Sequence, residues 1–189
     1  MTYQDNFQKW LDFAELPDYL RKDLEGMDEK TKEDAFYTNL EFGTAGMRGL
    51  IGAGTNRINI YVVRQATEGL ARLIEEKGDE FKKRGVAIAY DSRHFSPEFA
   101  FESAAVLAKH GIKSYVFESL RPTPELSFAV RHLGTFAGIM ITASHNPAPF
   151  NGYKVYGEDG GQMPPHDADA LTDYIRAIEN PFAIEVADV

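Results

Sequence analysis

The chain has 189 residues, of which 43% are hydrophobic and none is cysteine, and 20 Lys and Arg against 29 Asp and Glu give a formal net charge of −9. This length allows one substantial domain or two small ones, and the acidic balance argues against nucleic-acid and anionic-membrane partners, which require a basic surface. The lack of cysteine excludes disulfides, thiolate metal sites and cysteine nucleophiles. No apolar run approaches the roughly 18 residues that span a bilayer and the first residues show no signal-peptide pattern, so we expect a soluble, cytoplasmic protein.

Residues 1–40 are predicted to form a helical, acidic lead-in that packs on the rest of the chain. Phe7, Trp10 and Leu11 recur at helical spacing, and Pro17 ends that segment. Further helices are expected over residues 18–24 and 28–40. Their outer faces are charged, as is ordinary for amphipathic helices that pack through an apolar side.

Glycine dominates the next segment, where Gly43, Gly46, Gly49, Gly52 and Gly54 stand within twelve positions. Such a density suits turns and a close approach of the backbone to a ligand. Residues 57–60 favour a short strand or the return limb of a hairpin. A helix is expected over residues 61–77, because its apolar residues share one face.

From residue 86 onward, strand and helix patterns alternate. Strands are predicted over 86–90, 114–117, 138–141 and 152–156, and helices over 96–110, 123–134 and 166–178, with Ser96 and Pro97 as helix cap and first-turn proline. This alternation indicates βαβ units. We therefore predict an α/β fold over residues 41–189, a three-layer α/β/α domain with a mixed, mostly parallel sheet, to which the glycine-rich hairpin adds an antiparallel strand.

The first chemically informative motif is Thr142-Ala143-Ser144-His145-Asn146-Pro147. It follows the strand predicted over 138–141, so Ser144 is expected on a tight loop at a strand's carboxyl end, where open α/β sheets place their ligands. A serine hydroxyl needs a base, a cation or a metal to act as a nucleophile. His145 adjoins Ser144 and Lys154 follows ten residues later. A purely structural turn is the alternative, and the absence of Gly-x-Ser-x-Gly argues against an acyl hydrolase.

The second motif is Gly43-Thr44-Ala45-Gly46-Met47-Arg48-Gly49. Its glycines expose backbone N–H groups and its arginine adds a cation, a combination that binds phosphate in other proteins. It lacks the Gly-x-x-x-x-Gly-Lys pattern of a nucleotide P-loop. A glycine-rich hairpin with a surface arginine is the alternative interpretation.

Together with Asn151-Gly152-Tyr153-Lys154, the two motifs resemble the first domain of the α-D-phosphohexomutases, the phosphoglucomutase/phosphomannomutase family. The resemblance extends from about residue 40 to the C-terminus. The Thr-Ala-Ser-His-Asn-Pro order is highly specific, and the helical lead-in further resembles the longer bacterial phosphoglucomutases of the family.

This resemblance implies roles at the reacting centre. Ser144 would carry the phosphoryl group, and the phosphate on it would ligate Mg²⁺. Arg48 would contact the phosphoserine. His145 and Lys154 would be the candidates for proton transfer at the sugar hydroxyl.

The resemblance also implies residues that bind phosphate or substrate around that centre, namely Thr44, Gly46, Arg48, Arg93 and Asn146. Arg93 matches the family's Asp-x-Arg segment and would support the site. A structural ion pair with Asp91 is the alternative for Arg93.

The implied reaction interconverts glucose 1-phosphate and glucose 6-phosphate through phosphoserine and a hexose 1,6-bisphosphate. Positioning and charge compensation are what phosphoryl transfer chiefly requires of a protein, which agrees with these roles. Phosphomannomutase or phosphopentomutase activity is an alternative, because the sugar-recognition loop of the family is absent. A non-catalytic anion-binding module and a phosphoserine hydrolase are the rival interpretations.

The departures from the family concern what this chain lacks. Full-length members are four-domain proteins well over twice this length, and the Asp-x-Asp-x-Asp-Arg loop of their second domain supplies the Mg²⁺ carboxylates. Residues 166–170 contain only an Asp-x-Asp at the start of a predicted helix, where acidic residues favour the helix dipole. We therefore expect an isolated first domain that needs the missing domains of the same enzyme, is inactive alone, and self-associates through exposed surface.

Overall fold

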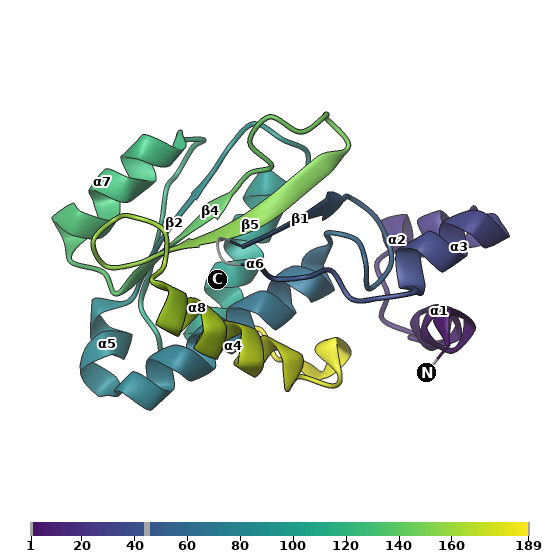
Figure 1. Ribbon diagram of the computed structural model, residues 1–189, viewed down its shortest axis with the longest axis horizontal. Coiled ribbons are helices and arrows are strands. Elements are labelled where there is room, and N and C mark those ends of the chain that lie inside the picture. The colour runs from purple at the N-terminus through teal and green to yellow at the C-terminus, as the bar shows by residue number, and fades with distance from the viewer. Residues whose placement is uncertain (1, 44–45, 189) are drawn as a thin grey trace.

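The structure is a computed structural model and describes residues 2–43 and 46–188 (Figure 1). Its centre is a five-stranded sheet in the order β1-β5-β4-β2-β3. The strands are β1 (Gly46–Leu50), β2 (Val86–Tyr90), β3 (Ser114–Val116), β4 (Ala137–Ile141) and β5 (Phe150–Tyr156). β2 pairs in parallel with β3 and β4, whereas β5 runs antiparallel to β4 and to β1. Among the described strands only β5 opposes the common direction of the sheet, so the predicted mixed, mostly parallel sheet is confirmed.

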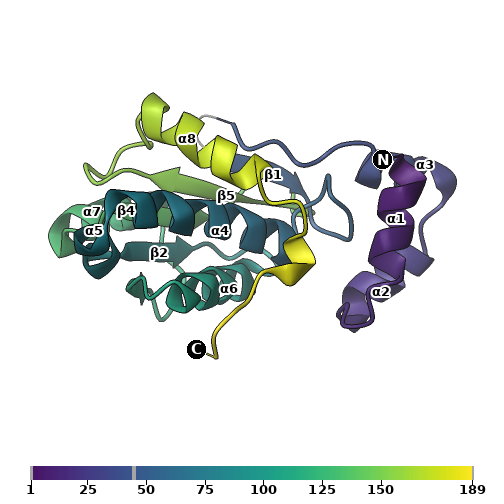
Figure 2. The ribbon, with the colours of Figure 1, turned by 90° about the horizontal axis from the view of Figure 1, so that it is seen from below.

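Helices cover both faces of this sheet. The helices α4 (Ile60–Lys77), α6 (Ser96–Lys109) and α8 (Pro165–Arg176) lie on one face, toward the viewer in Figure 2, and α7 (Thr123–Leu133) lies on the other. Side chains of β2 divide accordingly. Val86 and Ile88 join the main core with α4 and α6, whereas Ala87 and Ala89 pack in a smaller cluster with α7. The α/β/α layering is therefore as predicted.

The N-terminal helices α1 (Tyr3–Leu11), α2 (Asp18–Glu25) and α3 (Glu29–Phe36) lie beside the sheet, at the right of Figure 1. They enclose a hydrophobic cluster of their own, in which Trp10 and Phe36 pack with Tyr61 from the start of α4. The short 3₁₀ helix Pro181–Ala183 joins this cluster. Its Phe182 stacks on Phe13 at 4.3 Å between ring centroids and meets Trp10 edge-on at 5.2 Å.

Two local predictions near the glycine-rich segment and α6 are wrong. Residues 57–60 form no strand, because the Asn59 side chain accepts the N–H groups of Tyr61 and Val62 and thereby starts α4. β1 pairs along its length with β5, and the segment returns to the end of β1 only through an isolated parallel bridge between Ile51 and Ile58, so the two do not form an antiparallel hairpin. Ser96 does not cap α6. It is the first helical residue, after Phe95 in the left-handed region at φ 63°.

Among the described residues, one α-helix has no counterpart in the prediction, α5 (Asp79–Arg84), and the 3₁₀ helix Pro181–Ala183 has none either. α5 is short and highly charged and buries none of its residues, so it lacks the apolar periodicity that identifies a helix. Among the described residues, no helix is both long and apolar enough to cross a membrane.

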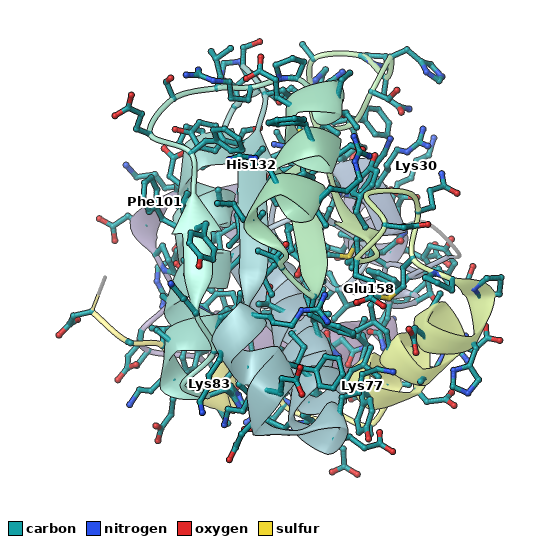
Figure 3. All side chains as sticks on the ribbon, turned by 90° about the vertical axis from the view of Figure 1, so that its left-hand side faces the viewer. Lys30, Lys77, Lys83, Phe101, His132 and Glu158 are labelled. Atoms are coloured by element: carbon teal, nitrogen blue, oxygen red, sulfur yellow. The ribbon has the colours of Figure 1, made fainter. Side chains whose placement is uncertain are left out.

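Several large apolar side chains stay exposed. They are Tyr19, Tyr37, Phe101, Leu120, Phe128 and Leu133. In Figure 3, which faces α7, Phe101 lies at one edge and His132 lies on the helix, where its ring stacks on Phe128 at 5.3 Å. Self-association through such surface stays a prediction.

Candidate active site

Ser144 lies on a tight loop directly after β4. Its backbone has φ 58°, in the left-handed region that residues other than glycine seldom adopt. The Ser144 N–H donates to Thr142 Oγ1 at 3.0 Å, and the Asn146 N–H donates to the Ala143 carbonyl at 3.1 Å. Ser144 itself is exposed. Backbone strain of this kind costs about 1–3 kcal/mol and concentrates at functional positions.

Arg93 binds the backbone of the same loop. Its Nη1 donates to the carbonyls of Pro147 and Phe150, both at 3.0 Å. Its Nη2 donates to the carbonyls of Ser144 at 3.0 Å and Asn146 at 2.7 Å. All four terminal N–H groups are thereby directed at protein oxygens, which is a structural role for Arg93, and a contact from Arg93 to phosphate stays a prediction.

The half-buried Asp91 and two buried polar side chains behind it hold Arg93 in turn. Asp91 Oδ2 lies 3.4 Å from Arg93 Nε, and Asp91 Oδ1 accepts the Arg93 N–H and the Ser96 hydroxyl. Asn151 Nδ2 donates to Ser96 Oγ at 2.9 Å and to the His94 carbonyl at 3.0 Å. Sequence reasoning assigned no such role to Ser96 or Asn151, since nothing in their spacing relates them to Arg93.

Arg48 approaches the serine loop from the neighbouring strand. Its Nη1 donates to Asn146 Oδ1 at 3.2 Å. The register of β1 on β5 sets Arg48 opposite Gly152, and a Cβ at Gly152 would lie 3.0 Å from Arg48 Cγ. The structure therefore brings together Arg48 and Asn146, two residues predicted to contact phosphate.

Lys154 lies two residues along β5 from Gly152, opposite Gly46 of β1 and Met140 of β4. Burial and, second, the positive charge of Arg48 lower the pKa of Lys154. Lys154 therefore loses its proton at a lower pH than an ordinary lysine, and a neutral amine can accept a proton.

The other predicted residues are less informative. The Gly46 N–H donates to the Gly43 carbonyl at 3.2 Å, and a Cβ at Gly46 would lie 2.0 Å from the Tyr153 carbonyl oxygen, so close packing of β1 on β5 explains this glycine. Thr44 lies outside the described residues. His145 is exposed next to Ser144.

A hollow of about 400 Å³ adjoins Ser144, lined by Asp91, Ser92, Arg93, His94, Ser144 and Ala148. Ser92 and His94 are exposed there and were not singled out from the sequence. Their place after β2, the strand beside β4, is the signal that could have found them, because carboxyl ends of adjacent parallel strands share one edge.

The described residues do not build a Mg²⁺ site by themselves. Among them, no three His, Asp or Glu side chains cluster in a geometry that could hold a metal ion. Mg²⁺ prefers six oxygen ligands. The carboxylate of Asp91 is engaged by Arg93 and Ser96, and Asp167, in the Asp-x-Asp segment, pairs with Lys77 at 3.0 Å. Ligands from outside this chain stay a prediction.

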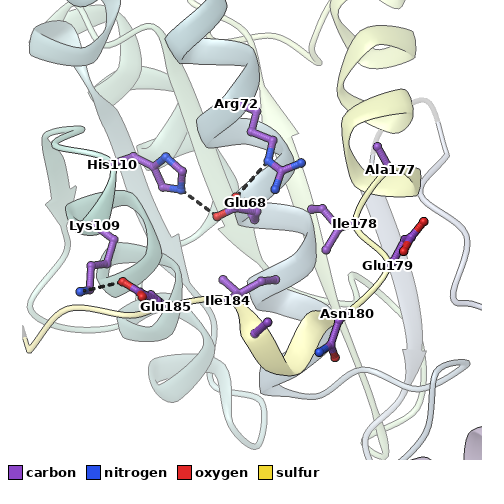
Figure 4. A pocket seen from close by; sticks show the side chains of 11 residues that line it. Glu68, Arg72, Lys109, His110, Ala177, Ile178, Glu179, Asn180, Ile184 and Glu185 are labelled. Atoms are coloured by element: carbon purple, nitrogen blue, oxygen red, sulfur yellow. Dashed lines mark hydrogen bonds and ion pairs between the residues drawn. The ribbon is translucent and has the colours of Figure 1, made fainter.

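A larger hollow of about 630 Å³ lies away from Ser144, between α4, the end of α6 and the segment after α8 (Figure 4). Most of the charged side chains that line it pair with one another. Glu68 accepts from Arg72 at 3.0 Å and contacts His110 at 2.7 Å, and Lys109 contacts Glu185 at 3.1 Å. These pairs join helices and tail and leave no concentrated charge for an anion, so Ser144 stays the candidate centre.

Known proteins are similar to this chain over most of its length. The family model described as phosphoglucomutase/phosphomannomutase, α/β/α domain I, matches residues 39–182. A phosphoglucomutase of Staphylococcus saprophyticus is 43% identical over 180 residues, which are 95% of this chain and 32% of that protein. A phosphoglucomutase of Staphylococcus aureus strain USA300 is 44% identical over 82% of this chain and 28% of that protein. A solved structure of a putative phosphomannomutase from Thermus thermophilus superposes with a TM-score of 0.65 at 33% identity, over 73% of this chain and 30% of that one. The chain thus spans about a third of the length of the curated relatives it matches.

Proposed function

This chain belongs to the phosphoglucomutase/phosphomannomutase family, and from that membership we propose that its serine loop accepts and returns the phosphoryl group of a hexose phosphate mutase. Ser144 is the proposed carrier. The substrate we propose is glucose 1-phosphate, interconverted with glucose 6-phosphate through hexose 1,6-bisphosphate, in line with the phosphoglucomutase names of its relatives.

The observation that carries this proposal is the convergence of a strained serine and a cation on one loop. Ser144 has φ 58° and an exposed position, and Arg48 reaches the same loop through Asn146 at 3.2 Å. An arginine can offer paired N–H donors to phosphate oxygens and compensate the charge that develops during transfer.

In the loading direction, Ser144 Oγ forms a bond to phosphorus of the hexose bisphosphate while the bond from phosphorus to the sugar oxygen breaks. The serine proton leaves through a neighbouring base and reaches the sugar oxygen. In the return direction a sugar hydroxyl attacks phosphorus of the phosphoserine and gives its proton to the same base, while the bond from phosphorus to Ser144 Oγ breaks and that oxygen takes the proton from the base. His145 and Lys154 are the proposed bases, and the lowered pKa of Lys154 supports that role.

The same proposal treats the chain as part of a larger catalytic unit. It spans about a third of its relatives, and its described residues offer no Mg²⁺ carboxylate set around Ser144. We expect Ser144 to be loaded slowly, and expect no sustained conversion of glucose 1-phosphate to glucose 6-phosphate by this chain alone. Robust conversion by the chain alone would contradict this expectation.

Intact-protein mass spectrometry after incubation with glucose 1,6-bisphosphate and Mg²⁺ tests the proposal. The expected result is a mass increase of one phosphoryl group that maps to Ser144 and is absent from Ser144→Ala. Anion binding with no covalent label would overturn the proposal in favour of a binding module. Steady release of inorganic phosphate would favour a phosphoserine hydrolase instead.

A further inference from the structure

We propose that Arg93 is a positioning residue that holds Ser144 in its left-handed, exposed conformation, an inference that rests on the proposed function of Ser144. Arg93 lies in the loop after β2, and the loop that it binds connects β4 to β5. The two loops meet at the carboxyl edge of the sheet, since β2 and β4 are adjacent and parallel.

The geometry of the contacts points to this role. Four carbonyls accept from one guanidinium, those of Ser144, Asn146, Pro147 and Phe150. They are distributed from the serine itself to the first residue of β5, so a single rigid group spans the connection. The guanidinium has a fixed planar set of five donors, whereas a lysine ammonium has three on a flexible stem. Lysine can keep the charge here but cannot serve all four carbonyls.

Arg93 is itself fixed in place. Its side chain is only 14% exposed, and Asp91 Oδ2 lies 3.4 Å from its Nε. Asp91 is held by the Ser96 hydroxyl, which accepts from Asn151, a residue with no exposed surface. Because these hydrogen bonds fix the guanidinium, its position determines the conformation of the loop that it binds.

This arrangement predicts a particular kinetic signature. The terminal N–H groups of Arg93 donate to carbonyls of the protein. Removal of the Arg93 side chain should therefore displace Ser144 Oγ without removing a ligand of the incoming phosphate. A displacement of about 1 Å at a reacting atom costs on the order of 100-fold in rate. The loading rate at saturating hexose bisphosphate should therefore fall by roughly 100-fold, and the half-saturating concentration should change by less than about 3-fold.

The test compares Arg93→Ala and Arg93→Lys with Arg131→Ala, a control on α7 whose Nη1 donates to Ser127 Oγ at 2.9 Å, away from the loop. NMR shifts of the Ser144 backbone, which report φ, are measured together with the loading rate by mass spectrometry. We expect both Arg93 variants to lose the left-handed shifts and the rate, free guanidinium to restore part of both in Arg93→Ala, and Arg131→Ala to match the parent.

Parental shifts and rate in Arg93→Ala would overturn the inference, and so would a raised half-saturating concentration at an unchanged rate, which would make Arg93 a phosphate ligand. If Arg93→Ala fails to fold, the shifts and loading rate of Arg93→Lys, which keeps the charge beside Asp91, decide the question instead. If the parent chain is never loaded, the proposed function fails, while the NMR comparison still decides whether Arg93 fixes the conformation of Ser144.

Discussion

Replacement of Gly152 by alanine should destabilise the chain by about 1–3 kcal/mol, the usual cost of overpacking a close contact. An added Cβ would lie 2.6 Å from the Met47 carbonyl oxygen, 2.6 Å from the Thr142 carbonyl oxygen and 3.0 Å from Arg48 Cγ. Ordinary contact begins at 3.4 Å, so each carbonyl would have to retreat by 0.8 Å, the difference between 3.4 and 2.6 Å. Both oxygens belong to backbone and cannot rotate away as a side chain would.

Thermal unfolding followed by circular dichroism measures this effect. One kcal/mol lowers Tm by roughly 2–4 °C in a chain of this size, so Tm should fall by roughly 2–12 °C. Gly26→Ala is the matched control, because its Cβ would meet only the Lys22 and Asp23 carbonyls at 3.5 and 3.7 Å and its φ is −85°. That substitution should raise stability by about 0.4–1 kcal/mol. An unchanged Tm in Gly152→Ala, or equal losses in both variants, would refute the reasoning.

Three other outcomes can be measured on the same chain. Because Arg48 contributes to the lowered pKa of Lys154, Arg48→Met should raise that pKa, as read from ¹³C-methylated lysine by NMR; a fall would contradict the assignment. Burial raises the pKa of Glu75, but hydrogen bonding and charge from His110 and then from Lys82 together outweigh it, so the net pKa lies below the ordinary value. The stability that this pair contributes is present above the ordinary glutamate pKa and is lost as pH falls through the folded-state pKa. In urea unfolding, Glu75→Gln should therefore cost about 0.5 kcal/mol or less near pH 6 and nothing near pH 3. A cost that grows toward acid pH would contradict this prediction. Phe182→Ala should cost about 1.5–3 kcal/mol in urea unfolding, since the half-buried ring contacts three aromatic side chains; an unaltered midpoint would show that the 3₁₀ segment is not anchored.

Most of the fold could be predicted because its signals are local. The runs 86–90 and 137–141 are buried along their whole length, and uninterrupted apolar residues identify such strands. The apolar face of α4 likewise follows from spacing alone. Asn59 misled the prediction, since its side chain takes over the first N–H groups of α4 in a segment that otherwise favours a strand.

The candidate site was predictable in its residue types but not in its connections. The motifs identified Ser144 and Arg48, yet the contact from Arg48 to Asn146 joins residues 98 positions apart and depends on the register of β1 on β5. The role of Arg93 is less visible still. Its partners are backbone carbonyls 51 to 57 positions away, and every residue type carries a carbonyl, so the sequence holds no sign of them.

The backbone angle of Ser144 has one more consequence. At φ 58° the residue that would fit with least steric conflict is glycine, which lacks the Cβ and the hydroxyl alike. The substitution that relaxes this loop is therefore also the one that deletes the hydroxyl oxygen that we propose as the phosphoryl acceptor. Folding and the proposed phosphoryl transfer favour different amino acids at position 144, and the chain carries the one that folding favours less.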